Sequence, residues 1–384
     1  MAQIDELRPG DTGRVSLAEI ARSFLKVGAV GFGGGVGMLA LLRNEVVERK
    51  HWIDDRQLGV AVTLGQMLPG PFVSNYAEYV GYQLRGWQGM AVAGLALLAP
   101  CFILMVGLSI LYFRFGSVPL VMRVFAGVQP VVVGILAWAT YTIGRANLRS
   151  RRSVLIAAIA ALALFFRGDI LLVVIGCGIL GIVLSARNTP AASGLVLLLP
   201  ALLGVTASAP SVLARAGELA LVFFKVGTVI FGGGFAAIPF LQHEVVDVRQ
   251  WLTMREFIDG VALGQITPGP VAITAAFIGY KVLGVPGALV AAAGTFLPSG
   301  LMLWGVIRVY HRIESNTLVQ RFLSGIMPAV TGMLLVTTVA VGRSAITGPV
   351  QAVVAPLALT LLLRFRPDPV WLVLAGGVVG LVSA

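Results

Sequence analysis

The sequence predicts an all-α polytopic integral membrane protein built from two homologous repeats in inverted topology. Composition is the first reason: 58% of the residues are apolar and 12% are charged, with a mean hydropathy of +0.93. Soluble domains carry about 25% charged residues. The alternating pattern of a membrane barrel is absent, so helices of about 20 mostly apolar residues are the expected spanning elements.

An internal duplication is the second reason. Residues 24–35 read FLKVGAVGFGGG and residues 223–234 read FFKVGTVIFGGG, so nine of twelve positions are identical at an offset of 199. The same offset joins LGQMLPGP at 64–71 to LGQITPGP at 263–270, and the second copy then loses one residue. The chain therefore divides into a polar tail (1–16), a first repeat (17–186), an apolar linker (187–212) and a second repeat (213–384).

Apolar segments follow in the same order in both copies. They span residues 17–42, 57–84, 87–113, 119–143, 153–166 and 170–186, and then 216–241, 256–283, 286–310, 319–342, 346–363 and 369–384. The stretch at 191–210 between the copies is either a further crossing or a surface linker. We therefore expect about 10 to 13 transmembrane segments.

Basic residues predict that the copies are inverted. After the fourth segment the first copy has four arginines between residues 145 and 152, whereas the second has only Arg343. The next loop reverses this, with Arg167 in the first copy against Arg364 and Arg366 in the second. Positive loops face the cytoplasm. Inversion requires an odd number of crossings per copy or a crossing by the linker.

Glycine and proline interrupt the first two segments of each copy, which is the third reason. Three successive glycines cost about 1 kcal/mol each relative to alanine in a helix, and each Pro-Gly-Pro triplet removes two backbone donors. We therefore expect 57–84 and 256–283 to be broken, as kinked spans or as re-entrant pairs of half-helices. The interrupting residues are Gly33, Gly34, Gly35, Pro69, Gly70, Pro71, Gly232, Gly233, Gly234, Pro268, Gly269 and Pro270.

An apolar chain of two repeats with such breaks is typical of a secondary transporter. The prolines predict that a half-helix restarts with Pro71 or Pro270 at its first position, aiming free N–H groups toward the midplane. Such helix starts bind anions. The neutral donors Gln66 and Gln265 add to this predicted oxyanion site. The alternative is that the prolines serve structure alone.

Further polar residues lie near these breaks in both copies. Asn75 and Thr274, one turn beyond the prolines, are additional candidate ligands. Lys26 and Lys225 precede the triple glycines and are either cations facing an anion pathway or snorkelling residues at the membrane surface. The glycines themselves either expose N–H groups to an anion or permit tight helix packing.

Glu78 is the one acid deep in an apolar stretch, and the second copy has Phe277 near that place. Because ionisable residues within membrane segments are expensive, Glu78 is a candidate proton-coupling carboxylate. The alternative is a structural partner for Arg85 or another basic residue.

Enzyme, metal and nucleic-acid functions find no support in the sequence. The three histidines lack metal-ligand spacing, and there is no nucleophile elbow or phosphate-binding loop, so no cofactor or metal is expected. Cys101 and Cys177 lie in apolar runs and are read as buried free thiols. The net charge of +11 comes mostly from residues between spans, so topology explains it better than nucleic-acid binding does.

At the Phe-Gly-Gly-Gly and Gln-x-x-Pro-Gly-Pro motifs of both copies, the chain resembles the chromate ion transporter family in its long-chain, two-domain form. The match covers about residues 17 to 384. The resemblance implies a bacterial or archaeal plasma-membrane protein that exports chromate, driven by the membrane potential or proton gradient, and confers chromate resistance. The second copy departs from the first where Asn75 becomes Thr274 and Glu78 loses its acidic counterpart, so we expect unequal contributions from the halves.

Alternatives remain open at this point. The substrate is chromate or a related oxyanion such as sulfate, and the mechanism is secondary active transport or passive anion conduction. A receptor that binds the anion without flux is a third reading. The bilayer is the expected surrounding, and the oligomeric state is open, with a homodimer among the alternatives.

Overall fold

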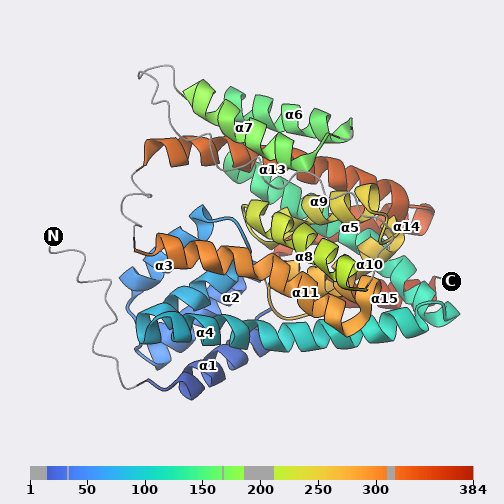
Figure 1. Cartoon of the computed structure of the whole chain (residues 1–384). Helices are drawn as coiled ribbons and strands as arrows, with labels where there is room; N and C mark the ends of the chain where they lie inside the picture. Colours follow the sequence, from blue (N-terminus) through green and yellow to red (C-terminus); the bar gives the residue numbers. More distant parts are fainter. Residues whose placement is uncertain (1–14, 33, 167, 186–211, 309–315, 384) are drawn as a thin grey trace.

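The computed structural model describes residues 15–32, 34–166, 168–185, 212–308 and 316–383 (Figure 1). Every regular element in these ranges is helical, which confirms the all-α prediction. The predicted tail and linker lie, apart from their last residues, outside the described residues, so the number of crossings stays a prediction. Cys101 and Cys177 are free and buried, as expected.

The two copies form the same succession of helices. The first contains α1 (Leu17–Val30), α2 (Gly34–Arg43), the π-helical turn η2 (Asn44–Arg49), α3 (Asp55–Met67), α4 (Phe72–Phe115), α5 (Pro119–Asn147), α6 (Arg151–Phe165) and α7 (Ile170–Ser185). The second contains α8 (Val212–Val229), η3 (Gly234–Ala236), α9 (Ala237–Gln242), η4 (His243–Val248), α10 (Met254–Ile266), η5 (Val271–Ile273), α11 (Thr274–Val306), α13 (Thr317–Ala345), α14 (Pro349–Phe365) and α15 (Pro369–Val382).

The Pro-Gly-Pro triplets are the tips of helical hairpins. In the second copy the Lys281 ammonium lies 2.7 Å from the Glu256 carboxylate, and a side chain at Gly260 would meet the ring of Phe277. Residues at equal distances before and after the triplet are thus neighbours. α10 has 13 residues, or about 20 Å, which is too short for a bilayer core of ~30 Å. The structure therefore favours paired half-helices over a kinked span.

A second reversal follows within α4 and α11. Gly86 and Gly284 have φ angles of 59° and 63° inside these helices, a left-handed conformation that glycine adopts without steric cost. Beyond the reversal the chain packs back on itself, so that Gly81 lies against Gly89 and Gly279 against Gly287. The segment boundaries predicted at 84–87 and 283–286 are confirmed.

The two copies interlock by exchanging their last helices. α6 and α7 pack on α13 of the second copy, while α14 and α15 pack on α5 of the first. Small residues allow this: Gly181 lies against Gly325, and Gly127 against Gly380. In Figure 1 the long parts of α4 and α11 run in opposite directions, and the two helices are in contact. Equivalent helices of the two copies are therefore inverted, as predicted.

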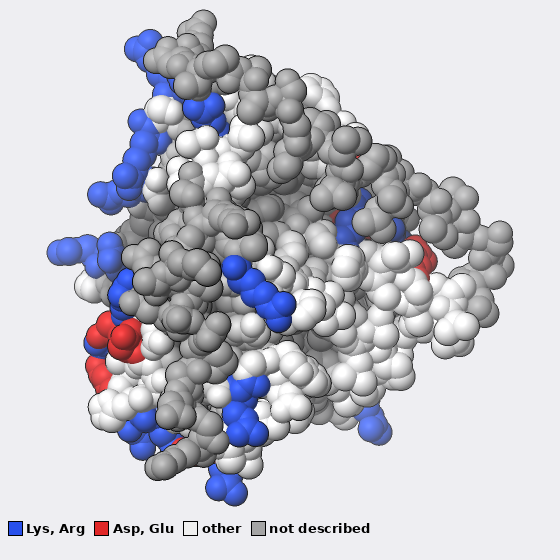
Figure 2. Space-filling view, turned by 60° about the vertical axis from the view of Figure 1, so that its left-hand side comes forward, with Lys and Arg blue, Asp and Glu red and all other residues white. Residues whose placement is uncertain are grey.

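Four helical stretches are long and apolar enough to cross a membrane: Phe72–Phe115, Pro119–Asn147, Val271–Val306 and Thr317–Ala345. Shorter apolar helices, α7, α14 and α15, lie beside them. Most of the basic side chains visible in Figure 2 lie in its left half, and a wide uncharged surface adjoins them. This distribution suits a multi-pass membrane protein, because charged residues avoid the hydrocarbon core.

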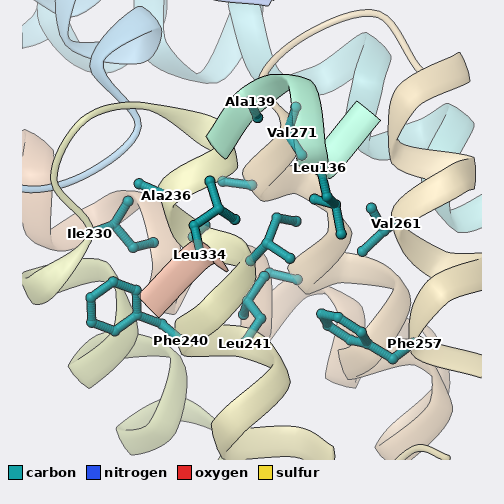
Figure 3. Packing of buried hydrophobic residues seen from close by; sticks show 14 of the residues in the cluster. Leu136, Ala139, Ile230, Ala236, Phe240, Leu241, Phe257, Val261, Val271 and Leu334 are labelled. Carbon is teal, nitrogen blue, oxygen red and sulfur yellow. The ribbon is translucent and has the colours of Figure 1, made fainter. Parts of the chain in front are cut away.

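The half-helices of the two copies sit in different surroundings. We call residues 17–84 the first half-helix unit, residues 212–283 the second half-helix unit, and α5, α6, α7, α13, α14 and α15 the central bundle. The second unit shares one continuous hydrophobic core with the bundle, where Phe240 and Phe257 pack near Leu136 and Leu334 (Figure 3). The first unit has a separate core with the end of α11.

Candidate functional site

The broken ends of four helices meet at the centre of the molecule. The Gly70 N–H donates to the Ile230 carbonyl at the end of α8, 2.6 Å away, and the Gly269 N–H donates to the Gly31 carbonyl at the end of α1, 2.8 Å away. Each hairpin tip is therefore bonded to the first half-helix of the other copy. Backbone groups freed by the prolines are satisfied by protein, as breaks within a membrane require.

Glycine is required at both tips. Gly70 and Gly269 have φ angles of 117° and 112°, outside the range that L-residues with a side chain favour. A side chain at Gly70 would meet Ser299 on α11, and one at Gly269 would meet Cys101 on α4, 3.0 Å away. Each tip thus presses against the long helix of the other copy, beside Pro298 or Pro100.

A cavity of about 310 Å³ opens beside these tips. Both copies and the central bundle line it, and its lining includes the following residues: Phe32, Gly35, Pro71, Phe72, Trp138, Thr142, Gly232, Gly233, Gly234, Gln265, Thr267, Gly269, Pro270, Val271 and Asp368. Many of the residues singled out in the sequence are therefore brought together here. No Lys or Arg belongs to the described lining.

Neutral N–H groups give the cavity its chemistry. Gln265 is 7% exposed, and its Nε2 has no hydrogen-bond partner within the described chain. Gly232 and Gly233 have φ angles of 88° and 100°, and their N–H groups make none of the backbone hydrogen bonds found outside the described helices. Both glycines line the cavity, so their N–H groups are candidate donors to an anion. An unpartnered buried amide costs about 1–3 kcal/mol unless a ligand satisfies it.

The prolines differ from the prediction in one respect. Pro71 and Pro270 occupy the N-cap, with extended backbone, and the helices begin at Phe72 and Val271. The reason is that the preceding glycine has a positive φ, so the chain is still turning at the proline. The helix starts nonetheless border the cavity, where their partial positive charge favours an anion.

The first copy places its predicted residues differently. Gln66, Pro69 and Gly70 do not belong to the cavity lining, and Gln66 is exposed. Asn75 is fully buried, and neither its amide nitrogen nor its amide oxygen has a partner in the described part of the chain. The Thr274 hydroxyl donates to the Val271 carbonyl at 2.8 Å, so its proton is already used within its own helix. Gly33 lies outside the described residues.

Both predicted lysines lie in ion pairs away from the cavity. The Lys26 ammonium is 3.0 Å from the Glu45 carboxylate, and that of Lys225 is 2.9 Å from Glu244. Arg49 and Arg249 contact the same two glutamates. Burial raises the pKa of Glu45, but its hydrogen bonds with Lys26 and Ser23 and the charges of Lys26 and Arg49 together outweigh this, so the pKa is lowered below its ordinary value. In this conformation each lysine therefore forms an ion pair with a buried glutamate.

Glu78 lies at the crossing of α4 and α11. It is 7% exposed, and its Oε2 has no partner within the described residues. The absence of side chains at Gly94 and Gly300 leaves room for its carboxylate. It borders a separate, largely apolar groove of about 700 Å³ between the two helices. No ion pair with Arg85 is found in the described structure.

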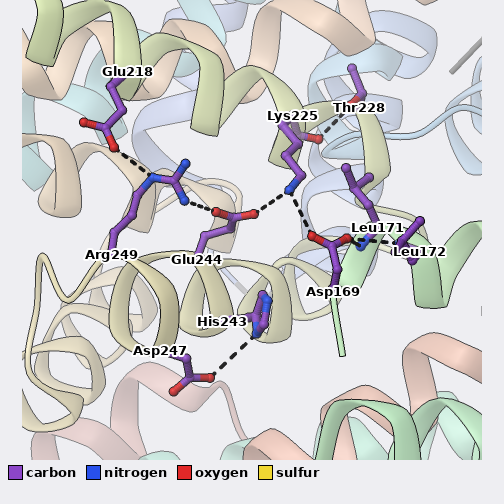
Figure 4. Close-up of polar contacts among 10 residues, drawn as sticks. All are labelled: Asp169, Leu171, Leu172, Glu218, Lys225, Thr228, His243, Glu244, Asp247 and Arg249. Carbon is purple, nitrogen blue, oxygen red and sulfur yellow. Dashed lines mark hydrogen bonds and ion pairs between the residues drawn. The ribbon is translucent and has the colours of Figure 1, made fainter. Parts of the chain in front are cut away.

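Sequence reasoning missed three aspartates. Asp368 lines the cavity and caps α15 by accepting from the Val370 N–H. Asp169 caps α7 in the same way and also pairs with Lys225 at 3.7 Å (Figure 4). The Arg-x-Asp spacing, repeated at 167–169 and 366–368, was the available signal. Asp259 has no such signal, because Val60 stands at the equivalent place.

Asp259 ties the second half-helix unit to the first copy. Its carboxylate accepts hydrogen bonds from the Tyr112 hydroxyl and from the Gln129 amide, both at 2.8 Å. Asp259 is 3% exposed, so it is held within the protein by donors from α4 and α5. This contact anchors α10 beside the central bundle.

Comparison with known proteins gives consistent matches along the chain. A family model described as chromate transporter matches residues 18–182 and again residues 217–381. The chain is 32% identical over 343 residues to the probable chromate transport protein of Synechococcus elongatus, covering 86% of each. It is 30% identical over 386 residues to the chromate transport protein of Cupriavidus metallidurans, covering 96% and 93%. For that of Pseudomonas aeruginosa, identity is 32% over 340 residues, covering 85% and 81%. No solved structure matches.

Proposed function

Because the chain belongs to the chromate transporter family, we propose that it is a secondary active transporter that exports chromate from the cytoplasm across the plasma membrane and so confers chromate resistance. The observation that carries the proposal is the buried, unpartnered Gln265 amide in a cavity formed where the broken helices meet. Transport without catalysis fits a site that offers hydrogen-bond donors to an anion.

The site suits a tetrahedral dianion. Gln265 and the N–H groups of Gly232 and Gly233 donate hydrogen bonds without a fixed countercharge, and the helix starts at Phe72 and Val271 add partial positive charge. Neutral donors hold an anion less tightly than lysine or arginine would, which permits release. Sulfate has the same shape and charge and is the runner-up substrate.

The membrane potential supplies the driving force in this proposal. Each charge moved outward through a negative-inside potential gains about 2.3 kcal/mol per 100 mV, so export of a dianion proceeds on voltage alone. Glu78 is the proposed site of any proton coupling, because its buried carboxylate has no cationic partner among the described residues and a buried unpaired charge is costly.

Chromate flux in proteoliposomes tests the proposal. Wild type, Gln265→Ala and the exposed control Gln88→Ala are compared with and without an imposed potential. We expect potential-driven flux in wild type and control, and a loss of about tenfold in Gln265→Ala, equivalent to ~1.4 kcal/mol of lost hydrogen bonding. Flux of sulfate but not of chromate would show that sulfate is the substrate. Conductance far above transporter turnover would indicate a channel. Absence of any flux in folded protein would contradict transport.

A further inference from the structure

The two half-helix units differ in how they contact the central bundle. In the second unit, α10 packs on α5, α13 and α15, and α9 packs on α13. In the first unit, α4 is the only described element on which α3 packs extensively. One unit is therefore docked on the bundle and its inverted counterpart is not, although their sequences are related.

A cross-copy ion pair accompanies the docked unit. The Lys225 ammonium, on α8, bridges Glu244 of its own unit and Asp169 at the start of α7, in the central bundle (Figure 4). Lys225 is 23% exposed in this setting. The pair thus fastens the second unit to the bundle near the C-terminal end of α8.

The equivalent pair on the other side is not formed. Lys26 corresponds to Lys225 at the 199-residue offset, and Asp368 corresponds to Asp169 because each ends the repeated Arg-x-Asp motif directly before α15 or α7. Lys26 contacts Glu45 of its own unit, and its side chain is 51% exposed. Asp368 caps α15 as Asp169 caps α7, but it borders the central cavity. All four residues are in place, and one of two equivalent pairs is made.

We propose that Lys225–Asp169 and Lys26–Asp368 form in alternation, each locking one of two opposite orientations of the transporter. The inference rests on the proposed transport function. Because the copies are inverted, docking the first unit as the second is docked here presents the cavity to the other side of the membrane. The Lys225–Asp169 pair must then open, and Lys26 reaches Asp368.

The exchange also changes the charge beside the anion. In the present orientation Asp368 lines the cavity without a lysine partner in the described structure, so its carboxylate weakens the hold on a dianion. When Lys26 pairs with Asp368, that charge is neutralised. Lys26 and Lys225, which pair with buried glutamates, therefore also determine which of the two aspartates is left without a lysine partner.

The present orientation has an additional anchor. Asp259 accepts from Tyr112 and Gln129, whereas its counterpart in the first unit is Val60 and the counterpart of Gln129 is Met327. The first unit consequently has no such hydrogen bonds to make on docking. Asp259→Val, which copies the first unit, is expected to shift the population toward the Lys26–Asp368 orientation.

Crosslinking of paired cysteines tests the proposal. In a Cys101→Ser/Cys177→Ala background, Lys225 and Asp169 are replaced by cysteine in one variant, and Lys26 and Asp368 in another. A short bifunctional thiol reagent is applied in proteoliposomes. A protease site inserted in the 187–212 linker then separates the copies, so that a crosslink keeps the fragments joined.

We expect both pairs to crosslink. Adding Asp259→Val should raise the Lys26/Asp368 yield and lower the Lys225/Asp169 yield by about threefold or more, as a shift between two populations requires. The surface control Glu48→Gln should change neither. Failure of either pair to crosslink in folded protein, or equal responses of the two pairs to Asp259→Val, would overturn the proposal.

A charge exchange gives a second, independent readout. Lys26→Asp and Asp368→Lys are made in a Glu45→Gln background, because Lys26 also pairs with the buried Glu45. Each should lower chromate flux, and the double variant should recover most of it; no recovery would contradict pairing. The crosslinks do not depend on flux. If both cysteine pairs crosslink and Asp259→Val shifts their yields, but the protein moves no chromate, the transport proposal alone is refuted. If the protein moves chromate but the Lys26/Asp368 pair does not crosslink, the alternation alone is refuted.

Discussion

The first and second half-helix units have related sequences and the same succession of helices, yet they do different things in this structure. Gln265 lies buried in the central cavity, whereas its counterpart Gln66 is exposed outside it. Lys225 reaches the central bundle, whereas Lys26 stays within its own unit. An inverted duplication supplies two equivalent sets of contacts, and a single conformation uses one of them. The role of each of these residues therefore depends on how its unit packs on the central bundle.

The hairpin tips should show the largest effect. Gly70→Ala combines a positive φ, which costs about 1–2 kcal/mol for a residue with a side chain, with a close contact at Ser299. Gly269→Ala makes a less severe contact, with Cys101 at 3.0 Å. We expect a larger fall in the thermal unfolding temperature for Gly70→Ala, partly restored by Ser299→Gly. Equal losses in the two variants would show that strain alone matters.

Asp259→Val should come next. It leaves the buried donors of Tyr112 and Gln129 without an acceptor, at about 1–3 kcal/mol for each unsatisfied group. We therefore expect a lower unfolding temperature in detergent. The double variant Asp259→Val/Gln129→Met, which copies Val60 and Met327, should recover part of it. A second variant no more stable than the first would argue against this anchor.

Glu78→Gln separates coupling from transport. The substitution keeps the shape of the side chain between Gly94 and Gly300 but removes the titratable proton. Chromate flux driven by an imposed potential should persist, and the part driven by a pH gradient should disappear. Measuring both gradients in the same vesicles decides the matter, since equal loss of the two would indicate a structural role.

Glu45→Gln should have the smallest effect, seen mainly as a change in acid sensitivity. The pKa of Glu45 is lowered in the folded protein from its ordinary 4.5, so its contribution to stability is present above pH 4.5 and is lost as pH falls through the lower folded pKa. Unfolding temperature measured against pH should therefore fall less steeply in acid for Glu45→Gln. Identical slopes would mean that Glu45 is not held by Lys26 in solution.

The sequence predicted the duplication, the breaks and the inversion because glycine, proline and charge act locally or through topology. Pro69-Gly70-Pro71 must end a helix wherever it stands, and the boundaries near 84 and 283 follow from Gly86 and Gly284. The partner of Lys26 was not predictable in this way. Glu45 was present in the sequence, but only packing decides whether a lysine faces a buried acid or a pathway.

The asymmetry between the two half-helix units could not be predicted from the sequence either. Gln66 and Gln265 stand in nearly identical motifs, so no local pattern separates the exposed one from the buried one. The difference arises from docking on α5 and α13, which are far away in sequence. Asp169 and Asp368 were readable as a repeated pair, but their roles depend on the same long-range packing.

Calorimetric measurement of chromate binding to purified wild type, Gln265→Ala and Gln66→Ala tests whether the anion binds beside Gln265. We expect Gln265→Ala to weaken binding by about tenfold, or ~1.4 kcal/mol, and Gln66→Ala to leave affinity nearly unchanged in the orientation anchored by Asp259. Unchanged affinity in Gln265→Ala, or equal losses in the two variants, would contradict the placement of the anion in the cavity beside the second copy's hairpin.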